Sequence, residues 1–190
     1  MTLRGDLVVL EPLREEHREE LAAVAPDPEV WRWMTVDGSR PELFAQWLDA
    51  ALAAAAAGAE VPFVQRDAHT GRALGSTRYL ALSPEHRTVE IGYTWLARSA
   101  WSTGVNAEAK LLLLEHAFQR LGCRRVEFKT DARNEHSRAA LAALPAQFEG
   151  IHRKKMLVRG GENRDSAWYS VVDDEWPQVR AALLARLGRA

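Results

Sequence analysis

Three strand-like runs with only short turns between them do most to limit how this chain can fold. They cover residues 61–65, 73–82 and 88–96. Turn-forming residues, among them Gly71 and Pro84, fill the two gaps between the runs. Runs of this kind that are joined by short turns pair as neighbours in one sheet. We therefore expect an antiparallel meander at the centre of the fold.

Helical patterns flank this meander on both sides. Before it, Ser39 and Glu42 form a capping-box pattern that predicts the start of a helix, and Gly58 is suited to end that helix. After it, apolar residues recur at intervals of three and four as far as Gly122, which is typical of a helix with one buried face. These apolar residues are Ala107, Leu111, Leu114, Phe118 and Leu121.

The remaining segments alternate between strand and helix patterns. The expected strands cover residues 7–10, 124–130, 148–158 and 165–172, and the expected helices cover residues 15–25 and 134–144, with a last helix after the acidic residues 173–175. With 47% hydrophobic residues the chain can build a core, and no internal repeat or linker divides it. The prediction is one α/β domain over residues 1–190, in which the meander is followed by the order β-α-β-α-β-β-α.

Composition excludes several classes of protein. A net charge of −1 leaves no strongly basic surface for nucleic acid. The single Cys123 excludes an intrachain disulfide framework and a Cys-based zinc site, and the six histidines lack ligand spacing, so we expect no metal. The alanine-rich run at residues 50–58 is too short to cross a bilayer, and no targeting segment is visible. We expect a cytoplasmic protein with no nucleic-acid or membrane partner.

The junction between the third meander strand and the next helix is the most informative candidate for a site. The strand ends near Leu96, a loop of small residues follows, and the helix starts after Gly104. The first turn of a helix leaves backbone N–H groups unpaired and carries about half a positive charge. Small residues let an anion approach these groups closely, so the pattern is typical of a pyrophosphate site. An ordinary capped helix start would give the same pattern.

Several short motifs surround this junction. Residues 101–106 read W-S-T-G-V-N, and Glu108 and Lys110 follow them. Further motifs occur in order along nearly the whole chain, at residues 89–93, 126–129, 134–137, 148–150 and 174–177. Together they resemble the GNAT superfamily of N-acetyltransferases, in particular the RimJ/RimL branch, whose signature is W-G-T-G-x-N-x-E-x-K. In this alignment residues 101–106 match the superfamily's cofactor motif, Q/R-x-x-G-x-G/A.

The resemblance implies a mixed, mostly antiparallel sheet with helices on both faces. The strand that ends at Leu96 would splay away from the strand that contains Glu127, and the pantetheine arm of acetyl-CoA would lie in the resulting cleft. That arm would run along Trp95 and Leu96 and contact Asn134. The pyrophosphate would lie on backbone amides of the loop and the first helical turn, which are those of Ser102, Thr103, Gly104, Val105 and Asn106.

Several positions depart from the family pattern. Ser102 stands where glycine is usual, which would weaken cofactor binding if its φ must be positive. Pro145 replaces the glycine of a Leu-Gly-Phe motif. Lys129 and Met156 stand where relatives often have a catalytic glutamate, and Leu141 stands where they often have an acidic tyrosine.

Acetyl transfer to an amine needs a neutral nucleophile and a proton or hydrogen bond for the departing thiolate. Glu90 is the candidate base, because it lies at the spacing before the loop where histone-type members carry their catalytic glutamate. Its alternative role is an ordinary strand ion pair with Arg78 or Arg87. Glu127 is the second candidate base. By resemblance to RimL-type members, Ser137 of the N-x-x-S motif would assist the thiolate.

The alternation of side chains along a strand predicts which way the Glu90 side chain points. It has the opposite parity to Val89, Ile91, Tyr93 and Trp95, and should point away from the face that those four residues bury.

The predicted function is transfer of the acetyl group of acetyl-CoA directly to a primary amine, either a protein N-terminus or a small molecule. The alternative is a non-catalytic CoA-binding sensor or interaction module. Trp33 and Met34 would line the acceptor pocket by resemblance, although an aromatic cluster there could equally be core. Relatives are often dimers, so a homodimer is possible.

Overall fold

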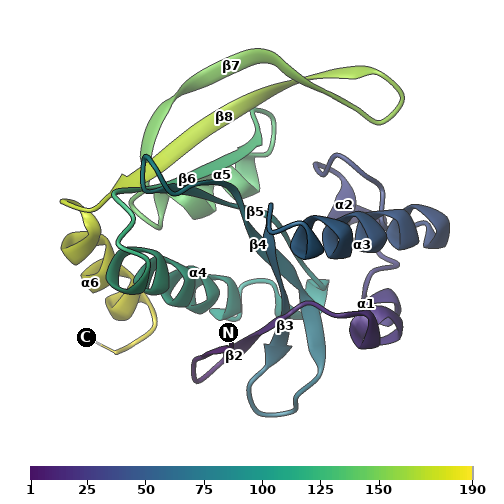
Figure 1. Ribbon diagram of the computed structural model, residues 1–190, viewed down its shortest axis with the longest axis horizontal. Coiled ribbons are helices and arrows are strands. Elements are labelled where there is room, and N and C mark those ends of the chain that lie inside the picture. The colour runs from purple at the N-terminus through teal and green to yellow at the C-terminus, as the bar shows by residue number, and fades with distance from the viewer. Residues whose placement is uncertain (190) are drawn as a thin grey trace.

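The computed structural model describes residues 1–189 and contains one eight-stranded mixed sheet between two groups of helices (Figure 1). The strand order is β1-β2-β3-β4-β5-β6-β8-β7, and every neighbouring pair is antiparallel except β5 and β6. The strands are β1 Leu3–Arg4, β2 Val8–Pro12, β3 Val61–Asp67, β4 Ala73–Ser83, β5 Thr88–Leu96, β6 Arg125–Asp131, β7 Gln147–Val158 and β8 Glu162–Val172.

Helices cover both faces of this sheet. In Figure 1, α4 and α6 lie together on one side of the sheet, and α1, α2 and α3 lie on the other. The α-helices are α1 Arg18–Val24, α2 Pro28–Trp31, α3 Pro41–Ala56, α4 Val105–Glu115, α5 Glu135–Ala142 and α6 Trp176–Arg186. Short 3-10 turns precede α1 and α4, and a π-helical turn at His116–Arg120 extends α4. The predicted fold class, an α/β domain with a mostly antiparallel sheet and helices on both faces, is confirmed.

Two apolar clusters form the core, one on each face. The larger joins α4, α5 and α6 to the sheet and includes Val89, Ile91 and Phe128. The smaller joins α1, α2 and α3 to the other face, where Trp31 packs against Trp95 with ring centroids 4.8 Å apart. The smaller cluster therefore covers β3, β4 and the end of β5, whereas the point where β5 and β6 meet has apolar cover only on the α4 side.

One helix start differs from the prediction. Ser39 does not cap α3, since the N-cap residue is Arg40 and no side chain caps this end. The Ser39 hydroxyl instead donates to Asp37 Oδ1 at 2.6 Å. Pro41 occupies the first helical position, which suits its fixed φ and missing N–H, so the helix begins one residue later than predicted and Ser39 lies outside the N-cap.

β5 and β6 separate after only three paired residues. Thr88 to Glu90 pair with Arg125 to Glu127, and beyond this point each strand keeps only its outer neighbour. β5 continues along β4 as far as Leu96, and β6 continues along β8 as far as Asp131. The two strands thus form the open V that the family resemblance implied.

A β-bulge in β5 changes which way its side chains point. Arg78 lies opposite Gly92 but Ser76 lies opposite Trp95, so β5 has one extra residue here, and Tyr93 has a φ of 47°. Because of the bulge, Val89 and Ile91 face α4 whereas Trp95 faces α3. The prediction that all four odd-numbered residues share one face is therefore wrong. Glu90 does point away from Val89 and Ile91, as expected.

Candidate active site

A cleft of about 810 Å³ opens where β5 and β6 part. It is bounded by β5, the loop before α4, the first turns of α4, α5 and the end of α2. This size is in the upper part of the range for small-molecule and cofactor sites. The cleft is lined by ten of the twelve predicted site residues, namely Trp33, Met34, Glu90, Trp95, Leu96, Ser102, Gly104, Asn106, Asn134 and Ser137.

The start of α4 presents a row of free backbone amides. None of the amides of residues 102–106 donates a hydrogen bond to another group in residues 1–189, and the first helical bond runs from Glu108 N to Gly104 O at 3.0 Å. No side chain caps this helix end. Five unpaired N–H groups at the positive end of a helix dipole form a strong anion site.

Two of these five residues have a positive φ, which only glycine adopts without strain. Gly104 has a φ of 90°, and a Cβ at this position would lie 3.0 Å from Leu7 Cδ1, so both conformation and space favour glycine. Ser102 has a φ of 61°. This is the positive φ that we expected to weaken cofactor binding at a serine. A serine in this conformation is strained by about 1 kcal/mol or more.

Thr103 and Val105, the two other predicted cofactor residues, do not line the cleft with their side chains. The Thr103 hydroxyl donates to the Ala100 carbonyl oxygen at 2.7 Å, and Val105 packs in the larger core cluster. Only their backbone amides are available. Asn106 does line the cleft, and its Oδ1 is a buried acceptor without a partner in residues 1–189. Such an atom favours a site that a ligand completes.

The opposite wall of the cleft is the start of α5. Asn134 caps this helix, because its Oδ1 accepts a hydrogen bond from Ser137 N at 3.0 Å. Leu141 and Leu144 mark the buried side of the helix, and Ser137 lies on the side that lines the cleft. Trp101, on the other wall, stacks on His136 with ring centroids 5.6 Å apart. The two walls therefore contact each other at this end of the cleft.

Glu90 lies at the bottom of the V and is only 2% exposed. It is paired with Lys129, whose Nζ lies 2.9 Å from Glu90 Oε2, and not with Arg78 or Arg87 as the alternative interpretation expected. Arg78 instead pairs with Glu60 at 2.7 Å. Burial raises the pKa of Glu90, and the charge of Lys129 offsets part of that rise. A buried carboxylate with a raised pKa suits a general base.

Glu127 lies beside Glu90 in the strand register but does not line the cleft. Its carboxylate accepts a hydrogen bond from Arg125 Nε at 2.8 Å. Arg125 also holds Glu149 and Ser170. The second candidate base is therefore part of a surface ion-pair network, which is its ordinary structural role.

Two buried cations in the cleft were missed by the sequence analysis. Lys110 is 8% exposed, and its Nζ donates to Thr94 Oγ1 at 2.9 Å. Arg164 is 6% exposed and lies at the end of the cleft near Trp33. Lys110 could have been noticed, because it lies one turn after Asn106 on the same helix face. No local signal marks Arg164.

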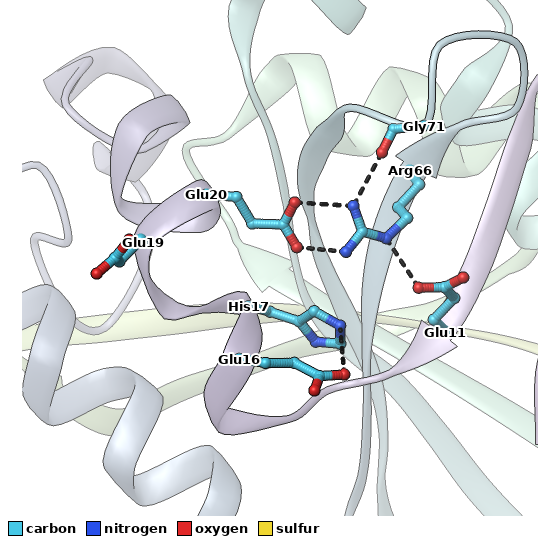
Figure 2. A pocket seen from close by; sticks show the side chains of 7 residues that line it. All are labelled: Glu11, Glu16, His17, Glu19, Glu20, Arg66 and Gly71. Atoms are coloured by element: carbon cyan, nitrogen blue, oxygen red, sulfur yellow. Dashed lines mark hydrogen bonds and ion pairs between the residues drawn. The ribbon is translucent and has the colours of Figure 1, made fainter.

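A second hollow lies between α1 and the ends of β2 and β3, and its one arginine, Arg66, is already paired (Figure 2). Arg66 donates from Nε to Glu11 at 2.8 Å and from Nη1 to both Glu20 and the Gly71 carbonyl oxygen at 2.8 Å. Because this cation has two carboxylate partners, the hollow leaves no free positive charge for an anionic ligand.

Within residues 1–189, no cluster of three His, Cys, Asp or Glu residues is placed to hold a metal ion. In the same part of the chain, every helix is too short or too polar to cross a membrane.

Known proteins share this fold and the cleft-forming segments. The family model "Acetyltransferase (GNAT) domain" matches residues 8–146. N-acetyltransferase YoaA of Bacillus subtilis (strain 168) is 27% identical over 175 residues, which cover 90% of this chain and 96% of YoaA.

Among solved structures, a GCN5-related N-acetyltransferase from Brucella melitensis has 30% identity and a TM-score of 0.89, with 97% of this chain and 84% of that chain covered. Mycobacterium smegmatis RimJ in complex with CoA-disulfide has 24% identity and a TM-score of 0.81, with 100% of this chain and 94% of RimJ covered. The match to the family model covers well over half of the sequence, and it includes the free amides at the start of α4 and the buried Glu90. The chain therefore belongs to the acetyltransferase (GNAT) family.

Proposed function

We propose that this acetyltransferase binds acetyl-CoA in the V between β5 and β6 and transfers the acetyl group directly to a primary amine. The observation that carries the proposal is the row of free amides at residues 102–106, which opens into the same cleft as the buried carboxylate of Glu90. The fold-sharing M. smegmatis RimJ was crystallised with CoA-disulfide, which supports a CoA ligand here. RimJ/RimL-type activity, on a protein N-terminus or a small amine, is the finer form of this proposal.

Binding would use the two ends of the cleft differently. The amides of Ser102 to Asn106 would hold the pyrophosphate, because they combine unpaired donors with the helix dipole. Backbone groups along the edge of β5 that β6 leaves after Glu90 would pair with the amides of the pantetheine arm, which would run past Trp95 and Leu96. The carbonyl oxygens of Trp95 and Leu96 themselves already accept hydrogen bonds from Gln65 Nε2 at 3.3 Å and Trp101 Nε1 at 2.8 Å. Asn134 and the buried Oδ1 of Asn106 would add contacts from the two walls.

Glu90 would act as the general base. The thioester supplies an activated acetyl carbon, and the attacking amine must lose a proton. The raised pKa of Glu90 makes it a better proton acceptor than an ordinary glutamate, directly or through a water molecule. Lys129 holds the carboxylate in place at 2.9 Å. Ser137 would donate a hydrogen bond to the departing thiolate from the α5 wall.

The proposal is tested by release of free CoA thiol from acetyl-CoA in the presence of a panel of amines. Ligand-induced melting shifts with CoA measure binding separately. Thiol release that depends on an amine supports the proposal. A melting shift without amine-dependent thiol release would favour the non-catalytic CoA-binding alternative, and the absence of any shift at millimolar CoA would overturn the cofactor site.

Substitution Glu90→Gln should lower kcat by about 100-fold or more, because it removes the proton acceptor and keeps the shape. It should also abolish the acidic limb of the pH–rate profile, while the CoA-induced melting shift persists. Glu127→Gln provides the comparison. If Glu127→Gln shows the large loss and Glu90→Gln does not, the roles of the two residues are reversed.

Substitution Ser137→Ala should lower kcat by about 10- to 100-fold, since a single donor to a developing anion contributes on this scale. The loss of kcat should be the same for amines of high and low pKa, because the substitution affects departure of the thiolate and not deprotonation of the amine. Unchanged turnover with an unchanged melting shift would remove Ser137 from the mechanism.

A further inference from the structure

The acceptor end of the cleft contains a buried arginine that no carboxylate neutralises. Arg164 lies on β8, and within residues 1–189 the one hydrogen bond of its guanidinium is a long contact of 3.5 Å from Nη1 to the Trp33 carbonyl oxygen. Its Nε is buried and has no partner. Burial lowers the pKa of this guanidinium below its ordinary value. Burying a charge without a partner costs free energy, so such an arrangement needs an explanation.

The two carboxylates whose charges act on Arg164, Asp131 and Glu90, do not neutralise it, because each is already held by another cation. Asp131 accepts from Arg133 Nε at 3.0 Å and from Arg133 Nη2 at 2.9 Å. Glu90 is held by Lys129. The negative charges of both carboxylates raise the pKa of Arg164, and the positive charge of Arg133 lowers it. Neither forms an ion pair with Arg164 in the described part of the chain.

Arg66 shows what a satisfied arginine looks like in the same molecule. It is more exposed than Arg164, yet it has Glu11, Glu20 and the Gly71 carbonyl oxygen as partners (Figure 2). The contrast shows that the fold readily supplies carboxylates to a structural arginine. Arg164 is more deeply buried and receives none.

The residues next to Arg164 on the same face of β8 show the same deficiency. Arg164, Ser166 and Trp168 alternate along the strand and so share one face of the sheet. Ser166 Oγ and Trp168 Nε1 are also buried without hydrogen-bond partners in residues 1–189. Of these three residues only Arg164 lines the cleft, so its unpartnered donors are the ones that a ligand in the cleft could reach.

We infer that the acceptor of this enzyme is an amine that carries a carboxylate close to its amino group, as an amino acid does, and that Arg164 binds this carboxylate. The inference rests on the proposed acetyl transfer and names its substrate class. The planar guanidinium fork matches a carboxylate, which makes the pair strong and directional. Because Arg164 and Glu90 line one cleft and feel each other's charge, a carboxylate on Arg164 leaves the neighbouring amine close to the proposed base.

The same end of the cleft also indicates what the rest of the acceptor is like. Trp33, Met34 and Met156 line it beside Arg164. These side chains offer an apolar surface, on which methionine adapts well to different shapes. An amino acid with an apolar side chain fits both features.

The test compares matched acceptors that differ only at the carboxylate. The panel contains the common amino acids, each with its amide and its decarboxylated amine, for example leucine, leucinamide and 3-methylbutylamine. We expect kcat/KM for the best amino acid to exceed that of its two partners by about 100-fold or more, because a site built for a polar group rejects an analogue without it. The amine of the amide is less basic, so its intrinsic reactivity works against the expected result.

Arg164→Gln identifies the residue responsible. We expect it to raise KM for the amino acid by about 30-fold or more with a smaller change in kcat, and to reduce discrimination against the amide to a few-fold. Arg164→Lys should keep part of the preference, since it keeps the charge without the fork. Arg153→Gln on the exposed strand β7 is the matched control and should keep the full preference. An unchanged CoA-induced melting shift shows that each variant is folded.

The outcomes separate this inference from the proposed function. If uncharged amines, or amines with a phosphate in place of the carboxylate, are the best acceptors, acetyl transfer stands and the carboxylate assignment falls. If Arg164→Gln keeps the full preference for the amino acid, the preference does not come from Arg164 and the inference is overturned. If no amine of any kind is acetylated although CoA binds, the proposed transfer fails, and this inference fails with it.

Discussion

Helix α4 contains two buried charged residues, Glu108 and Lys110, and their charges are compensated to very different degrees. Glu108 is fully buried and accepts hydrogen bonds from the backbone amides of Asp6 at 2.9 Å, Leu7 at 2.6 Å and Val8 at 2.7 Å. It also forms an ion pair with Arg189. Burial alone would raise the pKa of Glu108, but these partners outweigh burial and hold the pKa below its ordinary value.

Lys110 lies two residues further along the helix, on the side that lines the cleft. Its partner is the Thr94 hydroxyl, which also bonds to Thr77 Oγ1 at 2.8 Å. No carboxylate within residues 1–189 forms an ion pair with it. Burial lowers the pKa of Lys110 from 10.5 to about 7.

Glu108 is thus a buried charge that stabilises the fold, whereas Lys110 is a buried charge that remains available to a ligand. Glu108 joins the N-terminal strands to α4, and every acceptor position on it is used. Lys110 stabilises nothing comparable, so its burial costs free energy in the absence of a ligand. Arg66 and Arg164 repeat this contrast on the sheet. Within residues 1–189, the two buried cations that lack a carboxylate partner, Lys110 and Arg164, both line the cleft in which a ligand is expected.

The largest expected effect is loss of stability in Glu108→Gln. The amide offers one oxygen to three backbone N–H groups and leaves Arg189 without its buried partner. We expect destabilisation by about 3 kcal/mol, the lower end of the cost of breaking a buried ion pair. The melting temperature should fall by about 6–12 °C.

A control on the same helix sharpens this comparison. Glu115→Gln removes a partly exposed ion pair with Arg180, in which Glu115 Oε1 lies 3.1 Å from Arg180 Nε. It should cost less than about 1 kcal/mol. Equal losses in the two variants, measured by denaturant unfolding, would show that Glu108 is not special.

A smaller effect of opposite sign is expected for Lys110→Met. Removing a buried cation without a carboxylate partner should stabilise the chain by about 1–2 kcal/mol, provided that methionine fills the space. The melting shift induced by CoA should decrease at the same time, because the free charge faces the cleft. Thermal unfolding with and without CoA measures both. A loss of stability would mean that the bond to Thr94 holds α4 against β5, and the contrast with Glu108 would fail.

Sequence reasoning located the cleft well because the signals there are local. Gly104 after a loop of small residues predicts the start of α4, and the short turns predict the meander. The resemblance to histone-type members, which carry a glutamate at this spacing before the loop, placed the carboxylate of Glu90 in the cleft. Each of these features depends on residues that are close together in the chain.

The errors arose where distant segments decide the outcome. The partner of Glu90 is Lys129, which lies on a strand 39 residues away that only the folded sheet brings near. The bulge at Tyr93 comes from a mismatch between β4 and β5, and it reversed the predicted face of Trp95. Arg164 has no motif at all, because what marks it is burial without a partner. Local pattern predicts elements and helix ends, whereas charge pairing in the core is a tertiary property.

The last prediction uses pH to show that the free charge of Lys110 is responsible for the stabilisation in Lys110→Met. The folded chain releases this proton near pH 7 and the unfolded chain near pH 10.5, so between these values the unfolded state binds more protons. Wild-type stability should therefore rise with pH relative to the variant, and the advantage of Lys110→Met should shrink by about 1–2 kcal/mol between pH 7 and pH 8.5. Burial raises the pKa of Tyr79 and of Cys123 in both proteins, so their contributions cancel in the difference. Urea unfolding of both proteins at the two pH values measures it. A difference that is constant with pH would mean that Lys110 keeps an ordinary pKa in the folded chain, and α4 would then have no free buried charge to contrast with Glu108.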